Sequence, residues 1–392
     1  MATKDVVKAP ARDIESVIAE LEGLNPKARE KDLWIRTKWN TATQKPWHLG
    51  EAGAPGVKPH GLHPDHRQPV PHVWKWADIE PYLFKVAELC PLELTERQSV
   101  LLTNPAFGMQ GVKVTNTIRI AISIYKPGDD ATPHLHSPNA SRTILSEAGG
   151  FTVVEGERIP AARGDLILTP NGTWHQHGND DKTPVFWADI LDWPLKDFLG
   201  CVEVRNDYEN APNQRPDEGF SGRFYGKGGI KPLFAPFGRG HGQKTTPMFH
   251  YRGTEIRKTL EDLKRYDASP YDGVIVEFLD PVHARPPFPT LSYKAQLLRA
   301  GETTLAFRHS ASDVYCCLEG QGHTEIDGKR FEWGKNDFFI VPPYAWRRHT
   351  VTSKGDAVLY LVGDAPLYRA IGQYHAQGRT REGALIELSQ DS

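Results

Sequence analysis

Apolar and polar residues alternate along most of the middle and the end of this chain. Residues 112–125, for example, carry Val or Ile at nearly every second position, which is typical of a strand with one buried face. Gly-containing clusters interrupt the alternation at short intervals and predict hairpin turns. The pattern predicts strands near residues 99–104, 112–125, 142–146, 151–154, 165–169, 172–177 and 185–191.

Helical periodicity is limited to a few stretches. Apolar residues recur at helical spacing in residues 13–22, 73–86 and 251–266. Residues 41–71 are instead rich in Gly, Pro and His without periodicity, and predict a long loop that wraps the rest of the fold or covers a site. Residues 206–244 are similarly irregular and predict a connection between two domains.

The strand-rich pattern occurs twice. Segment 301–309 parallels 128–136, and segment 336–349 parallels 164–177. Such a repeat indicates two similar units in one chain. We therefore divide the chain into an N-terminal helical and loop extension (1–98), a first barrel (99–205), a linker with a helix (206–285) and a second barrel with a C-terminal tail (286–392).

Composition excludes several classes of function. The 392 residues are 39% hydrophobic and carry a net charge of −2, with no long basic run that would support nucleic-acid binding. No apolar stretch approaches the roughly 18–20 residues of a membrane span, and the polar first residues do not resemble a secretory signal. Because the four cysteines form no disulfide framework, we expect a cytoplasmic protein.

Two pairs of histidines are the strongest chemical signal. His134 and His136 are two residues apart, as are His175 and His177, so on a strand each pair points to one face. Two such strands can bring their imidazoles to one point, and imidazole is a common ligand for Fe, Cu, Zn and Ni.

The second copy of the pattern has lost these ligands. Phe307 stands at the position of His134, and Arg347 stands at the position of His175. Because arginine cannot be deprotonated to coordinate a metal, we expect the second barrel to be structural, with a degenerate metal site.

The spacing around the histidines resembles the cupin superfamily. Gly128, five residues and then His134-x-His136 look like the first cupin signature. Segment 164–179 matches every fixed position of the second signature, at Gly164, Pro170, Gly172, His175 and Asn179. The resemblance implies a mainly β bicupin fold, in which two β-barrels of the double-stranded β-helix type follow the N-terminal extension and a metal sits at a barrel mouth.

Several segments look more narrowly like the gentisate 1,2-dioxygenase family, whose members also cleave salicylate, substituted salicylates and 1-hydroxy-2-naphthoate. These segments are residues 71–78, 102–105, 134–142, 150–156 and 173–179. The resemblance implies a non-haem Fe(II) enzyme that uses O2 to open the ring of gentisate or a substituted salicylate between the carboxyl-bearing and hydroxyl-bearing carbons. Relatives are often homo-oligomers, and the many Trp and Phe residues would allow the same here.

The metal ligands implied by the resemblance are His134, His136 and His175. Many cupins add a Glu ligand, but Ala140 and Ser141 stand where that Glu would fall. Three neutral imidazoles leave three of six octahedral positions open, which suits the carboxylate and phenolate of a salicylate together with O2.

Three further residues take roles around the metal by the same resemblance. His177 is expected to hydrogen-bond substrate or oxygen, and Arg142 to bind the substrate carboxylate through its planar fork. Asp189 is expected to orient His177 or to pair with Arg142. For each of these side chains the alternative is a packed or outward-pointing residue without a catalytic role.

Three positions depart from the family pattern. The family usually has two successive basic residues where this chain reads Arg97-Gln98, a Tyr or Trp at Arg119, and a Gln at Ser123. We expect Arg119 to compensate for the arginine that Gln98 replaces, although an outward-pointing Arg119 is the alternative. The departures make a polar-substituted salicylate a competitor of gentisate, and the expected substrate-binding set is Arg142, His177, Arg119, Gln98, Ser123 and Trp174.

Two other classes of function stay open. One is a cupin isomerase or hydrolase that uses another divalent metal, and metal analysis together with O2 uptake would distinguish it. The other is a non-catalytic bicupin that binds a ligand, which purification of an inactive, metal-free protein with a bound small molecule would favour.

Overall fold

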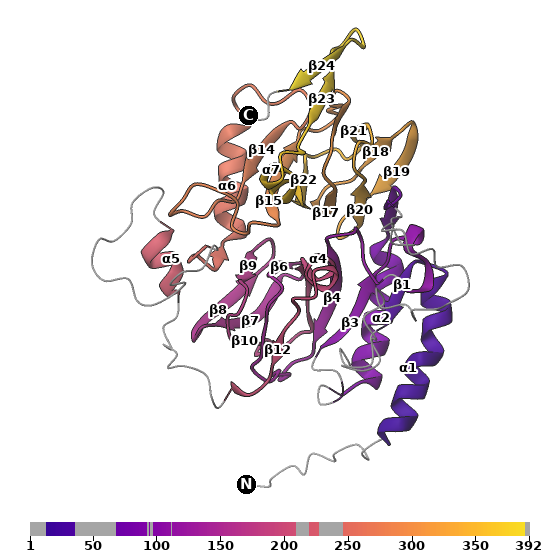
Figure 1. Ribbon diagram of the computed structural model, residues 1–392, viewed down its shortest axis with the longest axis vertical. Coiled ribbons are helices and arrows are strands. Elements are labelled where there is room, and N and C mark those ends of the chain that lie inside the picture. The colour runs from indigo at the N-terminus through magenta and orange to yellow at the C-terminus, as the bar shows by residue number, and fades with distance from the viewer. Residues whose placement is uncertain are drawn as a thin grey trace.

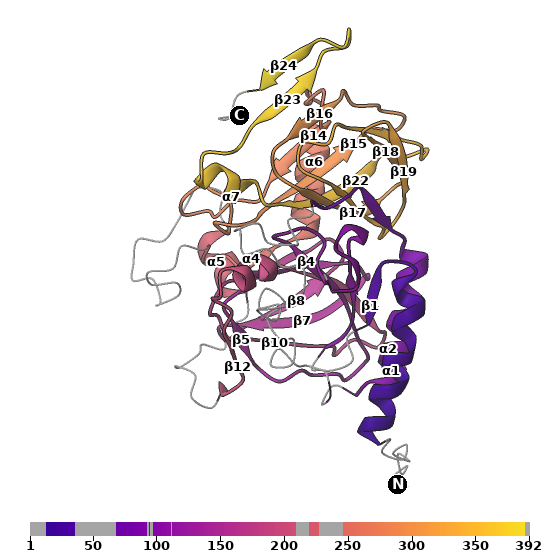
Figure 2. The same cartoon turned by 45° about the vertical axis from the view of Figure 1, so that its right-hand side comes forward.

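The computed structural model describes residues 13–35, 68–91, 94, 97–110, 112–208, 219–226 and 246–388. Two β-barrels lie one above the other, the first coloured magenta and the second orange to yellow, and helices α1 and α2 run along one side of the first barrel (Figures 1 and 2). The mainly β, two-barrel fold expected from the sequence repeat is therefore confirmed. Most of the expected loop at 41–71 and of the connection at 206–244 lies outside the described residues.

The helices are α1 (Ile14–Arg29), α2 (Trp76–Leu89), α4 (Trp193–Phe198), α5 (Phe220–Tyr225), α6 (Gly253–Leu263) and α7 (Ala365–Ala370), with a 3₁₀ segment at Pro105–Gln110. Strands of the N-terminal extension and the first barrel are β1 (Leu33–Ile35), β2 (His72–Trp74), β3 (Gln98–Leu102), β4 (Arg119–Tyr125), β5 (Leu135–His136), β6 (Ala140–Ile144), β7 (Ala148–Val154), β8 (Glu157–Ala162), β9 (Leu166–Thr169), β10 (His175–Gly178), β11 (Val185–Leu191), β12 (Val204–Arg205) and β13 (His250–Tyr251). Strands of the second barrel are β14 (Val274–Glu277), β15 (Ser292–Leu298), β16 (Phe307–His309), β17 (Asp313–Glu319), β18 (Gly322–Ile326), β19 (Lys329–Trp333), β20 (Phe338–Val341), β21 (Arg347–Val351), β22 (Ala357–Gly363), β23 (Ala376–Arg379) and β24 (Leu385–Leu388).

Three sequence predictions of element bounds were wrong in part. The helix predicted to end at residue 22 continues to Arg29, because Leu24 and Ala28 pack into the core beyond the apolar stripe. The helix predicted to begin at residue 73 begins at Trp76, because β2 pairs with a strand of the second barrel. The strand predicted from residue 112 begins at Arg119, because a turn closed by the Val114 N–H and the Ile118 carbonyl precedes it.

The first barrel is built from a seven-stranded sheet and a three-stranded sheet. The large sheet has the order β1-β3-β4-β11-β6-β9-β13, and the small sheet has the order β10-β7-β8. Strand β11 is central, so Asp189 lies opposite Ala121 on one neighbour and Arg142 on the other. This register brings side chains from β4, β6 and β11 to one place inside the barrel.

The second barrel consists of two six-stranded sheets, with the orders β14-β15-β22-β17-β20-β2 and β19-β18-β21-β16-β23-β24. Strand β2 belongs to the N-terminal extension, whereas β1 of the same extension pairs with β3 of the first barrel. The Trp76 N–H donates to Asp337 at 2.7 Å beside that junction. The extension therefore joins the two barrels by backbone pairing with both.

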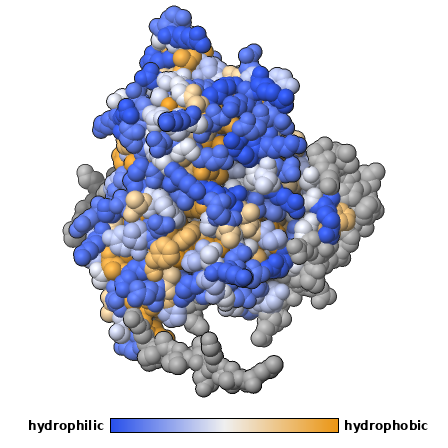
Figure 3. Space-filling view, turned by 180° about the vertical axis from the view of Figure 1, so that it is seen from behind, coloured by the Kyte–Doolittle hydropathy of each residue, from blue (hydrophilic) through white to orange (hydrophobic). Residues whose placement is uncertain are grey.

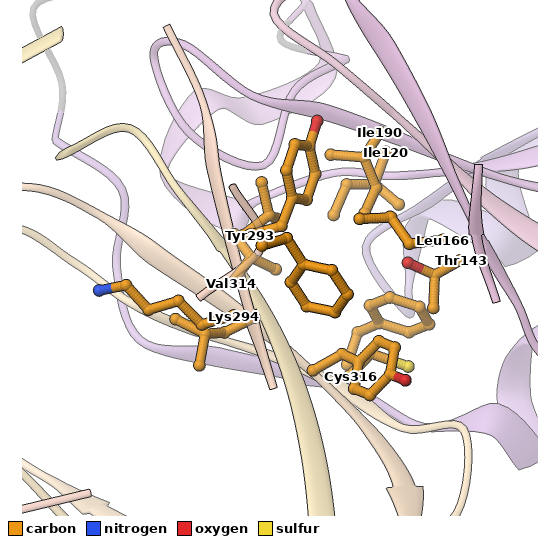
Figure 4. Close-up of a pocket in the computed structure, with 13 residues that line it drawn as sticks. Ile120, Thr143, Leu166, Ile190, Tyr293, Lys294, Val314 and Cys316 are labelled. Carbon is orange, nitrogen blue, oxygen red and sulfur yellow. The ribbon is translucent and has the colours of Figure 1, made fainter. Parts of the chain in front are cut away.

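The largest hydrophobic core lies between the two barrels. It combines residues of the first barrel, such as Ile122 and Leu168, with residues of the second, such as Val314 and Ile340. A void of about 10 Å³ remains there, lined by Tyr293 and other side chains of both barrels (Figure 4). Such a space holds no more than about one water molecule, so the two barrels are closely packed.

In the described part of the chain, no helix is long and apolar enough to cross a bilayer. Seen from behind, hydrophobic residues form small groups among polar ones (Figure 3). All four cysteines are free thiols, as the sequence led us to expect.

Close packing between the barrels predicts that truncation of Ile340 lowers the stability of the fold substantially. This side chain is fully buried, so we expect Ile340→Ala to lower the free energy of unfolding by about 2–5 kcal/mol through lost burial and a cavity. Guanidinium unfolding followed by tryptophan fluorescence measures the loss. Ile371→Ala is the matched control, because Ile371 is 62% exposed and its truncation should change little. Equal losses in the two variants would contradict the packing argument.

Candidate metal centre and active site

Four histidines of the first barrel come together on β5, β10 and the residue before β5. The backbone N–H of His134 donates to the His175 carbonyl at 3.0 Å, and the N–H of His175 donates back at 2.9 Å. Because of this pairing the His134 and His175 rings lie 4.3 Å apart between centroids, and the His136 ring lies 4.7 Å from His175. His177 follows on the same face, 5.4 Å from His175. The two-residue spacing thus brings all four imidazoles into one cluster.

Glycine turns support this arrangement. Gly128 has a φ of 83° and Gly164 a φ of 81°, a region of backbone conformation that side chains disfavour. The N–H of Gly172 donates to the His136 carbonyl at 3.0 Å, and its φ is 72°. The bend before β10 is therefore tied directly to the strand that carries the first histidine pair.

Backbone carbonyls select the tautomer of three of the imidazoles. The Nδ1 atom lies 3.2 Å from the Thr132 carbonyl in His134, 2.7 Å from the Pro138 carbonyl in His136 and 2.8 Å from the Thr173 carbonyl in His175. A carbonyl can only accept, so each Nδ1 carries the proton and each Nε2 presents a lone pair. The Nε2 atoms of His136 and His175 are buried and have no hydrogen-bond partner among the described residues, as expected of metal-ligand atoms in a site without its ion.

Burial keeps these rings neutral. Burial lowers the pKa of His136, His175 and His177 well below the ordinary value, and neighbouring histidines and arginines lower it further. A neutral imidazole is the form that binds a metal. The cluster is therefore suited to hold a cation at neutral pH.

His177 differs from the other three because both of its nitrogens have side-chain partners. Its Nε2 lies 2.6 Å from Nη2 of Arg142, and its Nδ1 lies 3.2 Å from Oγ1 of Thr152. Arginine only donates, so His177 accepts through Nε2 and donates its Nδ1 proton to Thr152.

One set of three histidines has the geometry of a metal site among the described residues, and the sequence implied another. In His134, His175 and His177 one ligand atom of each lies within 4.8 Å of the others. The set implied by the sequence replaces His177 by His136, whose Nε2 is buried without a partner. His134 belongs to both sets, and its Nε2 contacts Arg97. The sets differ at His136 and His177, and the contact of Arg142 with Nε2 of His177 favours the set that contains His136.

Arg142 and Asp189 form a buried ion pair beside the cluster. Arg142 Nε lies 2.9 Å from Asp189 Oδ1, and both side chains are at most 1% exposed. The other oxygen of Asp189 accepts from the hydroxyl of Ser123 at 2.6 Å and from the indole of Trp187 at 3.2 Å. Burial lowers the pKa of Arg142 to about 10 although Asp189 raises it, so the guanidinium stays charged at neutral pH. Asp189 is thus seen to pair with Arg142, one of its two expected partners.

Of the other residues expected to bind substrate, Arg119 lies near the histidine cluster, whereas Gln98 and Trp174 have their contacts elsewhere. Arg119 begins β4 and places its guanidinium 4.7 Å above the ring of Trp193, which itself lies 6.4 Å from the His136 ring. Gln98 points away from the cluster, because its amide donates to the Cys90 carbonyl. Trp174 packs on Tyr208, with ring centroids 5.4 Å apart, rather than on the histidines.

Sequence reasoning missed three residues of the site. Arg97 is 5% exposed and its Nη2 contacts Nε2 of His134, so Arg97 rather than its neighbour Gln98 faces the cluster. Thr152 and Trp193 were missed as well. The alternation of β7 opposite β10 could have indicated Thr152, whose Cα pairs with that of His177.

Comparison with known proteins identifies the relatives of this chain. Residues 121–191 and 296–363 each match the cupin domain model. The chain is 33% identical to a 5-aminosalicylate 1,2-dioxygenase of a Comamonas species, over 80% of this chain and 83% of that protein. It is 31% identical to a gentisate 1,2-dioxygenase of a Haloferax species, over 77% of this chain and 86% of that protein.

The chain belongs to the gentisate 1,2-dioxygenase family. Its fold agrees, because the salicylate 1,2-dioxygenase of Pseudaminobacter salicylatoxidans superposes with a TM-score of 0.73 at 26% identity, covering 84% of this chain and 94% of that one. This chain is therefore a bicupin ring-cleaving dioxygenase, as the resemblance led us to expect.

The buried ion pair of this dioxygenase predicts a large effect of neutralising Asp189. Asp189→Asn removes the charge opposite Arg142, so we expect a loss of about 3–5 kcal/mol in the free energy of unfolding. Chemical denaturation at pH 7 measures it. Asp262→Asn is the control, because Asp262 and its partner Arg265 are both more than half exposed and their pair should contribute about 1 kcal/mol or less. If Asp189→Asn lost no more unfolding free energy than Asp262→Asn, the buried ion pair would be contradicted.

Proposed function

We propose that this dioxygenase is a non-haem Fe(II) enzyme that opens the ring of gentisate or a substituted salicylate between its carboxyl-bearing and hydroxyl-bearing carbons. The observation that carries the proposal is the pair of buried Nε2 atoms of His136 and His175. Neither has a partner among the described residues, and the Nδ1 of each ring is held by a backbone carbonyl. Buried polar atoms rarely lack a partner unless a ligand supplies it.

The proposed ligands are His134, His136 and His175. His136 is preferred to His177 because its Nε2 has no partner among the described residues, whereas Nε2 of His177 contacts Arg142. Nε2 of His134 contacts Arg97, a contact that the metal would replace. Neutral imidazoles suit Fe(II), and no carboxylate joins them because Ala140 and Ser141 stand nearby on β6. When bound, the iron brings the aromatic acid and O2 together and allows electrons to pass between them.

Arg142 is the proposed partner of the substrate carboxylate. Asp189 holds its Nε edge, which leaves the two terminal nitrogens for other partners. One of these nitrogens contacts His177 and the other lies 3.4 Å from the hydroxyl of Thr169. A carboxylate that takes these nitrogens would release the His177 lone pair, so His177 is proposed to hydrogen-bond the substrate or oxygen.

Arg97 adds a second positive charge to the same place. Its guanidinium is buried, and its Nη2 contacts Nε2 of His134. Two buried guanidiniums favour an anionic substrate, and a salicylate brings a carboxylate beside a phenol that can lose its proton at the site. Burial of the whole cluster also keeps bulk water away from the ring as it opens.

The proposed reaction balances without another reductant. One carbon–carbon bond of the ring breaks, both atoms of O2 enter the product, and the four electrons that O2 takes up come from the aromatic ring. The relatives that act on 5-aminosalicylate, gentisate and 1-hydroxy-2-naphthoate support this class of substrate for the present chain.

Metal content of histidine variants distinguishes the two possible ligand sets. After anaerobic reconstitution with Fe(II), we expect His136→Ala to lose most bound iron, whereas His177→Ala keeps iron and loses turnover. The reason is that, of these two histidines, only His136 has an Nε2 without a partner among the described residues. Iron is measured by atomic emission after desalting. If His136→Ala kept its iron and His177→Ala lost it, the result would instead support His134, His175 and His177 as ligands.

A substrate panel tests the reaction itself. Gentisate, salicylate, 5-substituted salicylates and 1-hydroxy-2-naphthoate are added anaerobically to the Fe(II)-loaded protein, which is then exposed to ¹⁸O2. We expect a ring-opened product that carries two ¹⁸O atoms for at least one of the acids. Arg142→Lys, which keeps the charge without the planar fork, should raise KM by about tenfold or more. Turnover of substrate without O2 uptake would point to an isomerase or hydrolase instead.

A further inference from the structure

Ser123 contacts the carboxylate that pairs with Arg142. Its hydroxyl donates to Oδ2 of Asp189 at 2.6 Å, and the indole N–H of Trp187 donates to the same oxygen at 3.2 Å. The side chains of Ser123, Trp187 and Asp189 are each at most 1% exposed. Ser123, which the sequence places among the expected substrate-binding residues, therefore has a partner inside the protein.

Strand pairing brings these groups together. Trp187 lies two residues before Asp189 on β11, so both side chains share one face of the sheet. Ser123 of β4 is the cross-strand partner of Trp187, which places it diagonally across from Asp189. Arg142 of β6 is directly opposite Asp189 on the other side of β11. The carboxylate is thus held between the donors of β4 and β11 and the guanidinium of β6.

The ion pair between Asp189 and Arg142 is end-on rather than forked. Nε of Arg142 lies 2.9 Å from Oδ1 of Asp189, but the contact lacks the alignment of a hydrogen bond. A carboxylate that is free to turn frequently meets a guanidinium with both oxygens, through two parallel hydrogen bonds. Oδ2 of Asp189 does not take part in such a fork here, because Ser123 and Trp187 donate to it.

This arrangement keeps the terminal nitrogens of Arg142 at the histidine cluster. Nη2 lies 2.6 Å from Nε2 of His177, and Nη1 lies 3.4 Å from the hydroxyl of Thr169. A forked pair with Asp189 would use Nε and one terminal nitrogen, and would draw that nitrogen away from the cluster. The hydroxyl of Ser123 therefore decides how many nitrogens of Arg142 stay clear of Asp189.

The equivalent position of the second barrel has no such ion pair. The sequence repeat aligns Arg142 with Tyr315, whose cross-strand partner on β22 is Leu361. Both side chains belong to a hydrophobic core of that barrel. A barrel of this chain thus forms without a buried ion pair at this place, and such a pair is in general a weak source of stability. The network of the first barrel is better explained by the task of Arg142 than by folding.

We propose that Ser123 is a positioning residue that acts through Asp189 to keep Arg142 directed at the substrate carboxylate. The inference rests on the proposed function, because it takes Arg142 to bind that carboxylate. It adds the group that selects the end-on ion pair, and with it the preference of the site for a carboxylate over an uncharged group. Trp187 supports the same oxygen of Asp189 through a longer hydrogen bond.

Paired ligands test the proposal by binding. Isothermal titration under anaerobic conditions compares salicylate with salicylamide, which keeps the ring and the hydroxyl but has no carboxylate, on the Fe(II)-loaded protein. We expect the wild-type protein to bind salicylate about tenfold or more tightly, as one charge-assisted fork provides. Ser123→Ala should remove most of this preference, because Asp189 then competes with the substrate for Arg142. The affinity for salicylamide should stay within about threefold.

Steady-state turnover gives the split expected of a positioning residue. With an acid whose ring the wild-type protein opens, Ser123→Ala should raise KM about tenfold and leave kcat within about threefold. Ser123→Thr keeps the hydroxyl and should restore most of the affinity. Trp187→Phe removes the longer hydrogen bond and should lower the preference for salicylate by a smaller factor.

A crystal structure of Ser123→Ala examines the cause directly. We expect Asp189 to turn and to contact Arg142 with both oxygens. Ser310→Ala is the matched control, because Ser310 is a fully buried serine of the second barrel whose hydroxyl donates to the Gln373 carbonyl at 2.8 Å. Its removal should leave the preference for salicylate unchanged. Iron content and the melting temperature of each variant show whether the fold and the metal centre are intact.

The outcomes separate the two proposals. If Ser123→Ala keeps the preference for salicylate, or if Asp189 stays end-on in that variant, the inference is wrong even when the wild-type protein opens the ring. The inference is also wrong if Ser310→Ala lowers the preference as much as Ser123→Ala. If the wild-type protein neither binds nor opens any salicylate, the proposed function fails and the inference fails with it.

Discussion

Hydrogen bonds from imidazole Nδ1 atoms to backbone carbonyls are the constraint on which the site depends. The carbonyls of Thr132, Pro138 and Thr173 each lie two residues from the histidine that they orient. Local backbone geometry therefore fixes both the tautomer and the direction of each ring before any metal binds. The antiparallel exchange of hydrogen bonds between His134 and His175 then brings the two histidine-bearing segments to one point.

The second barrel shows what the same framework becomes when its ligands are replaced. Thr324 lies 2.8 Å from Nδ1 of His349, just as Thr152 lies beside His177 in the first barrel. In place of a third imidazole, however, Arg347 pairs with Asp272 inside the barrel. Arg347 thus finds its counter-ion within the protein, whereas the cations of the first barrel outnumber the carboxylate among them in the described chain. The contrast explains why we assign a ligand to the first barrel alone.

Sequence alone predicted the double barrel and the histidine cluster because both depend on short-range patterns. Alternation specified the strands, and the spacing from Gly128 to His136 specified a turn followed by two residues on one face. The choice between Arg97 and Gln98 could not be predicted, because it depends on which neighbour of a strand end faces inward. That orientation is fixed by a distant contact, the hydrogen bond from the Gln98 amide to Cys90. Long-range contacts likewise decided the bounds of α2, where pairing of β2 with β20 overrides helical periodicity.

Anomalous diffraction at the iron edge, from crystals of Fe(II)-loaded protein, tests the central claim most directly. The account predicts one strong peak, in the first barrel, within bonding distance of Nε2 of His134, His136 and His175, while Arg142 still contacts His177. A peak bonded to His177 in place of His136, or iron bound in the second barrel, would contradict it.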